Sequence, residues 1–205
     1  MNINNNLKKL ENIEFNNIKN AINIAEKKYG KKLVKNPDII KIIKILEKFI
    51  IKKKLLCYGG TAINNLLPNN IQFYDKSYQL PDYDVYSTCA IKCAKDLADL
   101  YYKNGFYDVE AKAGVHLGTY KVYVNFIAIA DITQIDTELY EILNKEKMVK
   151  DKIGYVPPNF LKMSCYLELS RPSGDIGRWE KVFYRLSLLN KYFPIRIDKN
   201  NENLS

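Results

Sequence analysis

The chain has 205 residues, of which 47% are hydrophobic and 27% charged, and it carries a formal net charge of +9. These values exclude a chain too small or too polar to fold, and they fit one or two compact domains with a hydrophobic core. The positive charge favours a polyanionic partner such as nucleic acid or a nucleotide, although a Lys-rich solvated surface explains it equally well.

Helices are predicted at the start of the chain. An Asn- and Lys-rich segment has weak helical periodicity from Leu7 to about Tyr29, where Gly30 is expected to end the helix. A clearer helix follows, because Asn36 can cap it, Pro37 suits its first position, and apolar residues then recur at helical spacing.

A strand, a glycine turn and a short helix come next. The apolar run 55–58 predicts a buried strand that enters a tight turn at Gly59 and Gly60. Thr61 can cap the following helix over 62–67. The later predicted elements are strands over 82–86, 107–112, 119–124 and 126–132, and helices over 89–104 (ended by Gly105), 136–144 (capped by Asp136), 160–169 and 176–192.

Strands dispersed among capped helices indicate an α/β (α+β) fold with a mixed sheet flanked by helices. We expect an N-terminal helical extension over residues 1–35 and a core over 36–156. The helical segment 157–205 either extends the core or begins a C-terminal domain.

The four cysteines lack paired CxxC spacing, so neither a disulfide framework nor a zinc site is predicted. We expect buried, reduced thiols at Cys57, Cys89, Cys93 and Cys165. No leader opens the sequence and no apolar run approaches membrane-spanning length. These features predict an intracellular, cytoplasmic protein without a membrane partner.

Two aspartates one residue apart, Asp82 and Asp84, carry the strongest chemical signal. Side chains on a strand repeat every two residues, so both carboxylates would lie on one face. Oxygen ligands that converge from one side suit a hard divalent cation such as Mg²⁺. The glycines before the short helix let backbone N–H groups of Gly60 and Thr61 approach phosphate oxygens. Together these motifs predict a site where metal ions meet a nucleotide triphosphate.

A third carboxylate, Asp131, lies in an otherwise apolar strand run. An ionised carboxylate there is costly unless it is paired or bound to metal, so a metal shared with Asp82 and Asp84 would satisfy it. A strand-end residue that faces water is the alternative. In the first interpretation the three carboxylates hold two divalent ions, one activating an attacking hydroxyl and one stabilising the leaving pyrophosphate.

Four blocks of sequence, in order, resemble the nucleotidyltransferase superfamily of DNA polymerase β, and within it the catalytic poly(A) polymerases of poxviruses and giant viruses. The blocks are Tyr58-Gly-Gly-Thr-Ala-Ile-Asn, Leu80-Pro-Asp-Tyr-Asp-Val-Tyr-Ser, His116-Leu-Gly-Thr-Tyr-Lys-Val-Tyr-Val-Asn and Arg178-Trp-Glu-Lys-Val-Phe-Tyr-Arg-Leu. The resemblance implies a polymerase β-like nucleotidyltransferase fold, with the catalytic core in residues 36–156.

The resemblance also implies Mg²⁺ or Mn²⁺ at Asp82, Asp84 and Asp131, and triphosphate contacts at Gly60 and Thr61. Two departures from the pattern stand out. The gap between Gly60 and Asp82 is longer than the usual superfamily spacing, and Asn125 on a nearby strand run leaves the register of the third carboxylate open. Family members usually continue beyond this length, so a part of a longer protein, a shortened paralogue and a minimal transferase are all compatible with the sequence.

Cationic side chains near the end of the chain are candidates for phosphate contact. Arg178, Lys181 and Arg185 share a helical face by their spacing. They could bind the triphosphate or an RNA backbone, or pair with acidic neighbours such as Glu168 and Glu180. We count Gly59, Gly60, Thr61, Arg178 and Lys181 as the nucleotide-binding set.

The leading hypothesis is a metal-dependent nucleotidyltransferase that adds AMP from ATP to RNA 3′ ends. The preference for adenylate comes from the resemblance alone, which also implies a host-cytoplasmic or virion location and leaves a homodimer or processivity partner open. The alternative is a catalytically silent module of the same fold that binds RNA or completes an assembly. A third option is transfer to a small molecule or protein hydroxyl.

Overall fold

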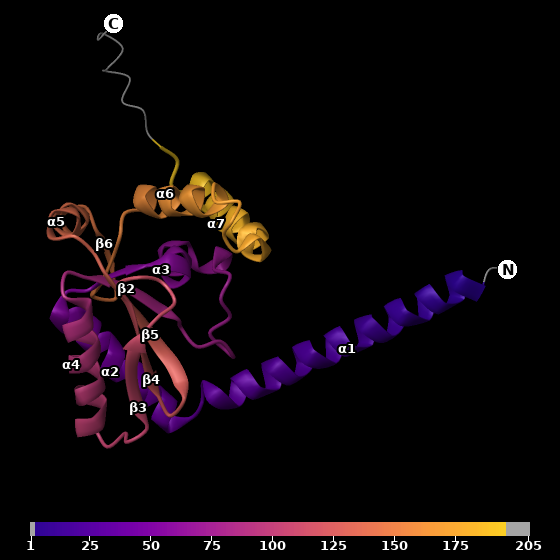
Figure 1. The fold of residues 1–205 in the computed structure, drawn as a ribbon, viewed down its shortest axis with the longest axis horizontal. Coiled ribbons are helices and arrows are strands. Elements are labelled where there is room, and N and C mark those ends of the chain that lie inside the picture. The colour runs from indigo at the N-terminus through magenta and orange to yellow at the C-terminus, as the bar shows by residue number, and fades with distance from the viewer. Residues whose placement is uncertain (1–2, 196–205) are drawn as a thin grey trace, which may run out of the picture. The chain divides into compact units, whose positions relative to one another are not determined.

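A computed structural model describes the backbone of residues 3–195 and the side chains of residues 12–195. Within these residues seven strands form one mixed sheet in the order β3-β4-β5-β2-β1-β7-β6, flanked by helices (Figure 1). This confirms the predicted fold class. The helices are α1 (Ile3–Leu33), α2 (Pro37–Lys53), α3 (Gly59–Leu66), α4 (Ala90–Lys103), α5 (Thr137–Lys145), α6 (Pro158–Leu169) and α7 (Trp179–Tyr192), with 3₁₀ turns at Asn69–Ile71 and Ile176–Arg178. The strands are β1 (Leu56–Tyr58), β2 (Tyr83–Ser87), β3 (Val109–Ala113), β4 (Thr119–Val124), β5 (Ile127–Gln134), β6 (Met148–Lys150) and β7 (Ile153–Tyr155).

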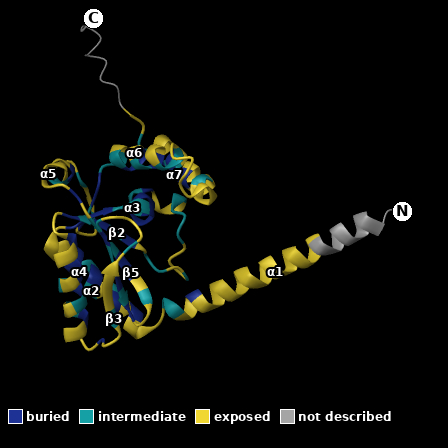
Figure 2. Ribbon diagram, in the orientation of Figure 1, coloured by how far each residue is buried: buried dark blue, intermediate teal, exposed yellow. Residues whose placement is uncertain are grey.

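The chain divides into two compact units, Met1–Lys41 with Tyr74–Pro81, and Ile42–Phe73 with Asp82–Ser205. The first unit contains α1, whose described side chains are almost all exposed (Figure 2). The prediction that Gly30 ends this helix is wrong, because the helix continues to Leu33. Gly30 is instead buried, and a Cβ at this position would overlap the carbonyl oxygen of Tyr78. Its small size therefore serves packing within this unit.

The second unit holds the whole sheet and its core. Helix α4 packs on β2, β3, β4 and β5. The hydroxyl of Tyr101 on α4 donates to the carbonyl oxygen of Ile42 on α2 at 2.8 Å, and the hydroxyl of Tyr83 donates to Glu47 at 2.8 Å. The hydroxyl groups of these buried tyrosines are thus hydrogen-bonded, and their rings pack in the core. One face of the sheet is thereby closed by α2 and α4.

Several predicted boundaries are confirmed. Helix α2 begins at Pro37, and Asn36 accepts a hydrogen bond from the backbone of Asp38 at 2.9 Å. Helix α5 is capped by Asp136, which accepts from the backbone of Glu138 at 2.8 Å. Gly105 has a φ of +89°, the left-handed conformation expected after α4.

Other predictions are wrong in detail. Thr61 does not cap the short helix, because α3 already begins at Gly59 and has no side-chain cap. Cys89 is exposed, whereas the other three cysteines are buried as expected. Strands β6 and β7 were missed, although β7 pairs in parallel with β1 and extends the sheet.

The register of the strands lines up one row of polar residues across the sheet. Tyr58 on β1 is paired with Asp84 on β2, and Asp84 with Asp131 on β5. Asp131 is paired in turn with Lys121 on β4, and Lys121 with Lys112 on β3. Directly paired residues lie on the same face. This row lies on the face opposite the buried β-strand residues that contact α2 and α4.

In the part of the chain that the structure describes, no helix combines the length and apolar character needed to cross a bilayer. The boundaries predicted at residues 36 and 157 remain predictions.

Candidate active site

The centre of the candidate site is Asp84, in the middle of the central strand β2. Burial, and then the negative charges of Asp82 and Asp131, raise the pKa of Asp84 to about 7, against the opposing effect of Lys121 and Arg185. The raised pKa means that the ionised carboxylate lacks compensating positive charge. A half-buried carboxylate beside two others is the arrangement that a bound cation relieves.

Asp82 immediately precedes β2 and keeps its side chain exposed. Partial desolvation, and then the charge of Asp131, raise the pKa of the Asp82 carboxyl. Lys121, Lys181 and Arg185 act to lower it. Solvent screens these effects more strongly here than at Asp84. Because Lys181 and Arg185 lie on α7, the positive charge of this helix acts on the carboxylate cluster.

Asp131 lies beside Asp84 because β2 and β5 are parallel neighbours in register. Asn125, which left the register of this strand open in the sequence, lies in the β4–β5 turn with a φ of +50°. The Lys121 ammonium group donates a hydrogen bond to the carboxylate of Asp131. Burial alone lowers the pKa of Lys121, but the bond to Asp131 and its charge outweigh burial and raise it.

Gly59 brings helix α3 against the carboxylates. Its φ is +69°, and a Cβ at this position would overlap the Oδ2 atom of Asp84. Only glycine combines this backbone conformation with the close approach. Gly60 and Thr61 are buried in the first turn of α3. The hydroxyl of Thr61 donates to the carbonyl oxygen of Asp82 at 2.5 Å, so it joins α3 to the start of β2.

The cationic residues of the C-terminal helices divide into two groups. Arg178 forms an ion pair with Glu168 on α6, with 3.3 Å between Nε and Oε1. Lys181 and Arg185 act on Asp82 electrostatically. Burial, and then the positive charges of Arg185 and Arg178, lower the pKa of Lys181, whereas Asp82 and Glu168 act to raise it. Three cationic side chains that act on one another favour an anionic ligand near Asp82.

Two aromatic residues at the site were not singled out by sequence reasoning. The rings of Tyr58 and Tyr86 stack with centroids 3.8 Å apart, and the hydroxyls of Tyr58 and Thr133 are 2.8 Å apart. The Arg185 guanidinium lies 5.3 Å from the centre of the Phe73 ring. The alternation of Tyr86 with Asp84 was the one available signal, because it places that ring on the carboxylate face.

The residues fit divalent cations by chemistry and charge. Carboxylate oxygens are the ligands that Mg²⁺ and Mn²⁺ take in proteins, and the site has three carboxylates, of which Asp82 and Asp84 have a raised pKa. Among the described side chains, no three from His, Cys, Asp and Glu are gathered tightly enough to enclose an ion. The Asp131 carboxylate is instead paired with the ammonium group of Lys121.

The mixed sheet, the Gly-Gly helix start and the paired aspartate strands define a nucleotidyltransferase fold. Residues 44–175 match the sequence model of a family described as poly(A) polymerase catalytic subunit. The chain belongs to this family. It is 27% identical over 166 residues to the protein assigned as the poly(A) polymerase catalytic subunit of African swine fever virus (isolate Pig/Kenya/KEN-50/1950), a match that covers 78% of this chain and 34% of that protein.

Giant viruses supply further relatives. The corresponding protein of Acanthamoeba polyphaga mimivirus is 31% identical over 158 residues, covering 75% of this chain and 26% of that protein. The crystal structure of the Megavirus polyadenylate synthase superposes with a TM-score of 0.78 at 27% identity, covering 91% of this chain and 39% of that one. The chain thus spans about a quarter to a third of the length of these curated relatives.

Proposed function

We propose that this chain is the catalytic part of a metal-dependent poly(A) polymerase, which adds AMP from ATP to the 3′ end of RNA. The observation that carries the proposal is the register of β2 and β5, which sets Asp131 beside Asp84 and close to Asp82. Membership of the poly(A) polymerase catalytic family supports the choice of ATP and RNA as substrates.

Each part of the site has a role in the proposed reaction. Backbone N–H groups of Gly59, Gly60 and Thr61 at the start of α3 bind triphosphate oxygens, because a helix N-terminus favours anions. Lys181 adds positive charge from α7, and Arg178 joins it when its pair with Glu168 opens. These contacts hold the triphosphate beside the carboxylates.

The bond changes are those of nucleotidyl transfer. The oxygen of the RNA 3′-hydroxyl forms a bond to the α-phosphorus of ATP, and the bond from that phosphorus to the bridging oxygen breaks. Pyrophosphate leaves, and the hydroxyl proton passes to water. Asp82 and Asp84 would hold the ion at the nucleotide, and all three carboxylates the ion at the hydroxyl. Mg²⁺ or Mn²⁺, when bound, lowers the pKa of the hydroxyl and neutralises the leaving group.

The proposal is tested by incubating the chain with ATP, Mg²⁺ or Mn²⁺ and labelled oligo(A). We expect a ladder of extended products, and its loss in the Asp82→Ala/Asp84→Ala variant. A Cys89→Ser variant, altered at an exposed position outside the site, serves as the control. A ladder that persists in the double aspartate variant would show that the site is wrongly assigned.

The net charge of +9 supports a second candidate, an RNA-binding or assembly module without turnover. This candidate predicts RNA binding whose affinity falls steeply with salt, and no incorporation of any nucleotide. A homodimer or processivity partner and a cytoplasmic location also stay predictions.

A further inference from the structure

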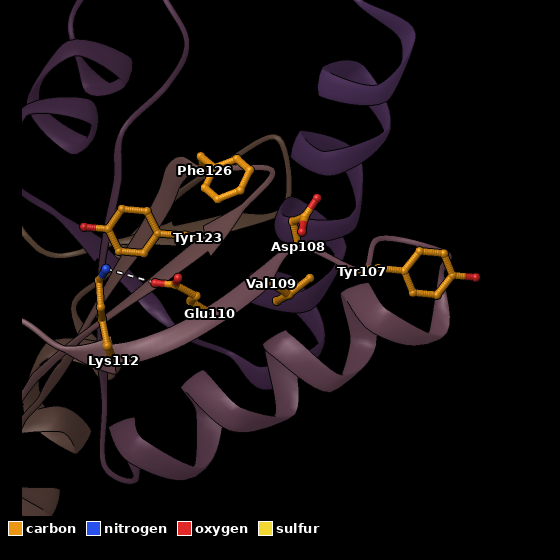
Figure 3. A pocket seen from close by; sticks show the side chains of 7 residues that line it. All are labelled: Tyr107, Asp108, Val109, Glu110, Lys112, Tyr123 and Phe126. Carbon is orange, nitrogen blue, oxygen red and sulfur yellow. Dashed lines mark hydrogen bonds and ion pairs between the residues drawn. The ribbon is translucent and has the colours of Figure 1, made fainter.

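A groove lies at the outer edge of the sheet, away from the carboxylates but on a continuation of the same face. It has a volume of about 360 Å³, at the small end of ligand sites, which span about 300–1,000 Å³. Tyr123 and Phe126 lie together on one side of it, with Glu110 and Lys112 beside them (Figure 3). Tyr107 also lines the groove, but its ring points away from the other side chains.

Phe126 occupies a conformation that its own side chain disfavours. Asn125 and Phe126 form the two-residue β4–β5 turn with φ of +50° and +65°. Glycine is preferred at the second position of such a turn, and a bulky residue there is strained. The Phe126 ring is nevertheless 83% exposed, so burial in the core does not offset the strain. A strained, exposed aromatic ring points to a binding role.

The polar groups of the groove suit the face and edge of a nucleobase. The Lys112 ammonium lies 4.3 Å from the centre of the Tyr123 ring and 2.9 Å from a Glu110 carboxylate oxygen. Asp108 adds a second carboxylate. These acidic groups repel phosphate, but they accept hydrogen bonds from the exocyclic amino group of a base. The aromatic rings supply a stacking surface.

The groove lies on the same face of the sheet as the candidate active site. Lys112 and Lys121 follow Asp131 in the same cross-strand row, so Lys112 is two strands, or about 10 Å, from Asp131. A strand of RNA whose 3′ end lies at Asp131 can therefore pass over the two lysines and reach the groove. A free nucleotide bound at the carboxylates is too short to extend into the groove.

We propose that this groove binds an amino-bearing base of the acceptor RNA a few nucleotides upstream of its 3′ end, and in a growing poly(A) tail this base is adenine. The base stacks on Tyr123 and Phe126, and its exocyclic amino group donates to Glu110 or Asp108. The proposal rests on the proposed function, since it takes the strand in the groove to be the acceptor.

The test measures the anisotropy of labelled oligo(A) and oligo(U) of about twelve nucleotides, a length within single-strand site sizes, without ATP and with metal chelated. We expect tighter binding of oligo(A). Phe126→Gly and Tyr123→Leu should weaken oligo(A) binding roughly 5-fold to 100-fold and abolish the preference over oligo(U). Leu117→Ala removes a fully exposed apolar side chain at the β3–β4 turn and should change neither affinity.

The Phe126→Gly variant separates binding from folding. Glycine at this position removes the backbone strain of the turn. The thermal midpoint of the variant should therefore equal or exceed that of the wild type, while its oligo(A) binding falls. If both aromatic variants bind oligo(A) with wild-type affinity, the proposal that this groove binds a base is wrong. Because binding is measured without turnover, an inactive chain that still prefers oligo(A) would refute the proposed function and support the groove.

Discussion

Lys121 and Asp131 face each other on antiparallel strands, and the ammonium group of the lysine bonds the carboxylate. The lysine therefore supplies the positive charge nearest to the third carboxylate of the site. A divalent ion that binds Asp131 has to compete with this charge or shift it aside.

Replacing Lys121 by Met should accordingly strengthen Mn²⁺ binding. Removing one nearby positive charge is worth on the order of 1 kcal/mol, or a several-fold gain in affinity. Calorimetric titration with Mn²⁺ measures the effect. Lys112→Met is the matched control, because Lys112 lies on the same face but is bonded to Glu110. Equal Mn²⁺ affinity in wild type and Lys121→Met would show that the ion pair does not restrain the site.

A second prediction compares two glycines that share a left-handed backbone. Gly59→Ala and Gly105→Ala both place a side chain at positive φ, which costs about 1–2 kcal/mol. A Cβ at position 105 meets nothing within 4 Å, whereas at position 59 it would overlap Asp84. We expect Gly59→Ala to lower the free energy of unfolding by at least about 1 kcal/mol more than Gly105→Ala in urea titrations. Equal losses would contradict the close approach.

The raised pKa of Asp84 makes a prediction about pH. Its pKa is about 7 in the folded chain against a reference of 3.8, so the folded state holds this proton more tightly than the unfolded state. The resulting stability is fully present below pH 4 and is lost as pH rises through about 7. The shift corresponds to at most about 4 kcal/mol.

The variant Asp84→Asn removes this pH-dependent contribution. In chelator, its thermal midpoint relative to wild type should rise between pH 5 and pH 8, because the neutral amide avoids the buried charge. The exposed Asp136→Asn change, which keeps a capping side chain, is the comparison. A difference between Asp84→Asn and wild type that stays constant over this range would mean that Asp84 is already compensated.

A further prediction concerns ATP. Lys181→Met should weaken ATP binding about tenfold, because a charge-assisted contact to phosphate is lost. Lys191→Met, an exposed change in the last turn of the same helix, should leave ATP binding unchanged. Fluorescence titration with a labelled ATP analogue in Mg²⁺ compares them. Similar affinities for the two variants would place the triphosphate away from α7.

The sequence predicted the elements whose signals are local. Helix α5 was found through Asp136, whose carboxylate caps the neighbouring backbone, and the end of α4 through Gly105. The Asp82–Asp84 spacing and the lone Asp131 also indicated the carboxylate group. Their closeness depends on strands that are adjacent in the sheet but separated in the chain.

What escaped prediction depends on tertiary contacts. Strands β6 and β7 have three residues each and are joined by Asp151 and Lys152 at positive φ, without the glycine that marks such turns. Thr61 bonds the carbonyl of Asp82, a residue distant in sequence, so no local pattern could show that it is not a helix cap. The Lys121–Asp131 pair likewise needs the register of β4 on β5.

The in-register parallel pairing of β2 with β5 has a consequence for how this domain tolerates change. Five successive residues of β2, from Tyr83 to Ser87, are matched to Ala130–Gln134. A slip of one residue would turn Asp131 toward the opposite face and into the layer covered by α4. Length changes within β5 are therefore far more damaging than most side-chain replacements there, and alignments of functional relatives should be free of gaps between Ala130 and Gln134.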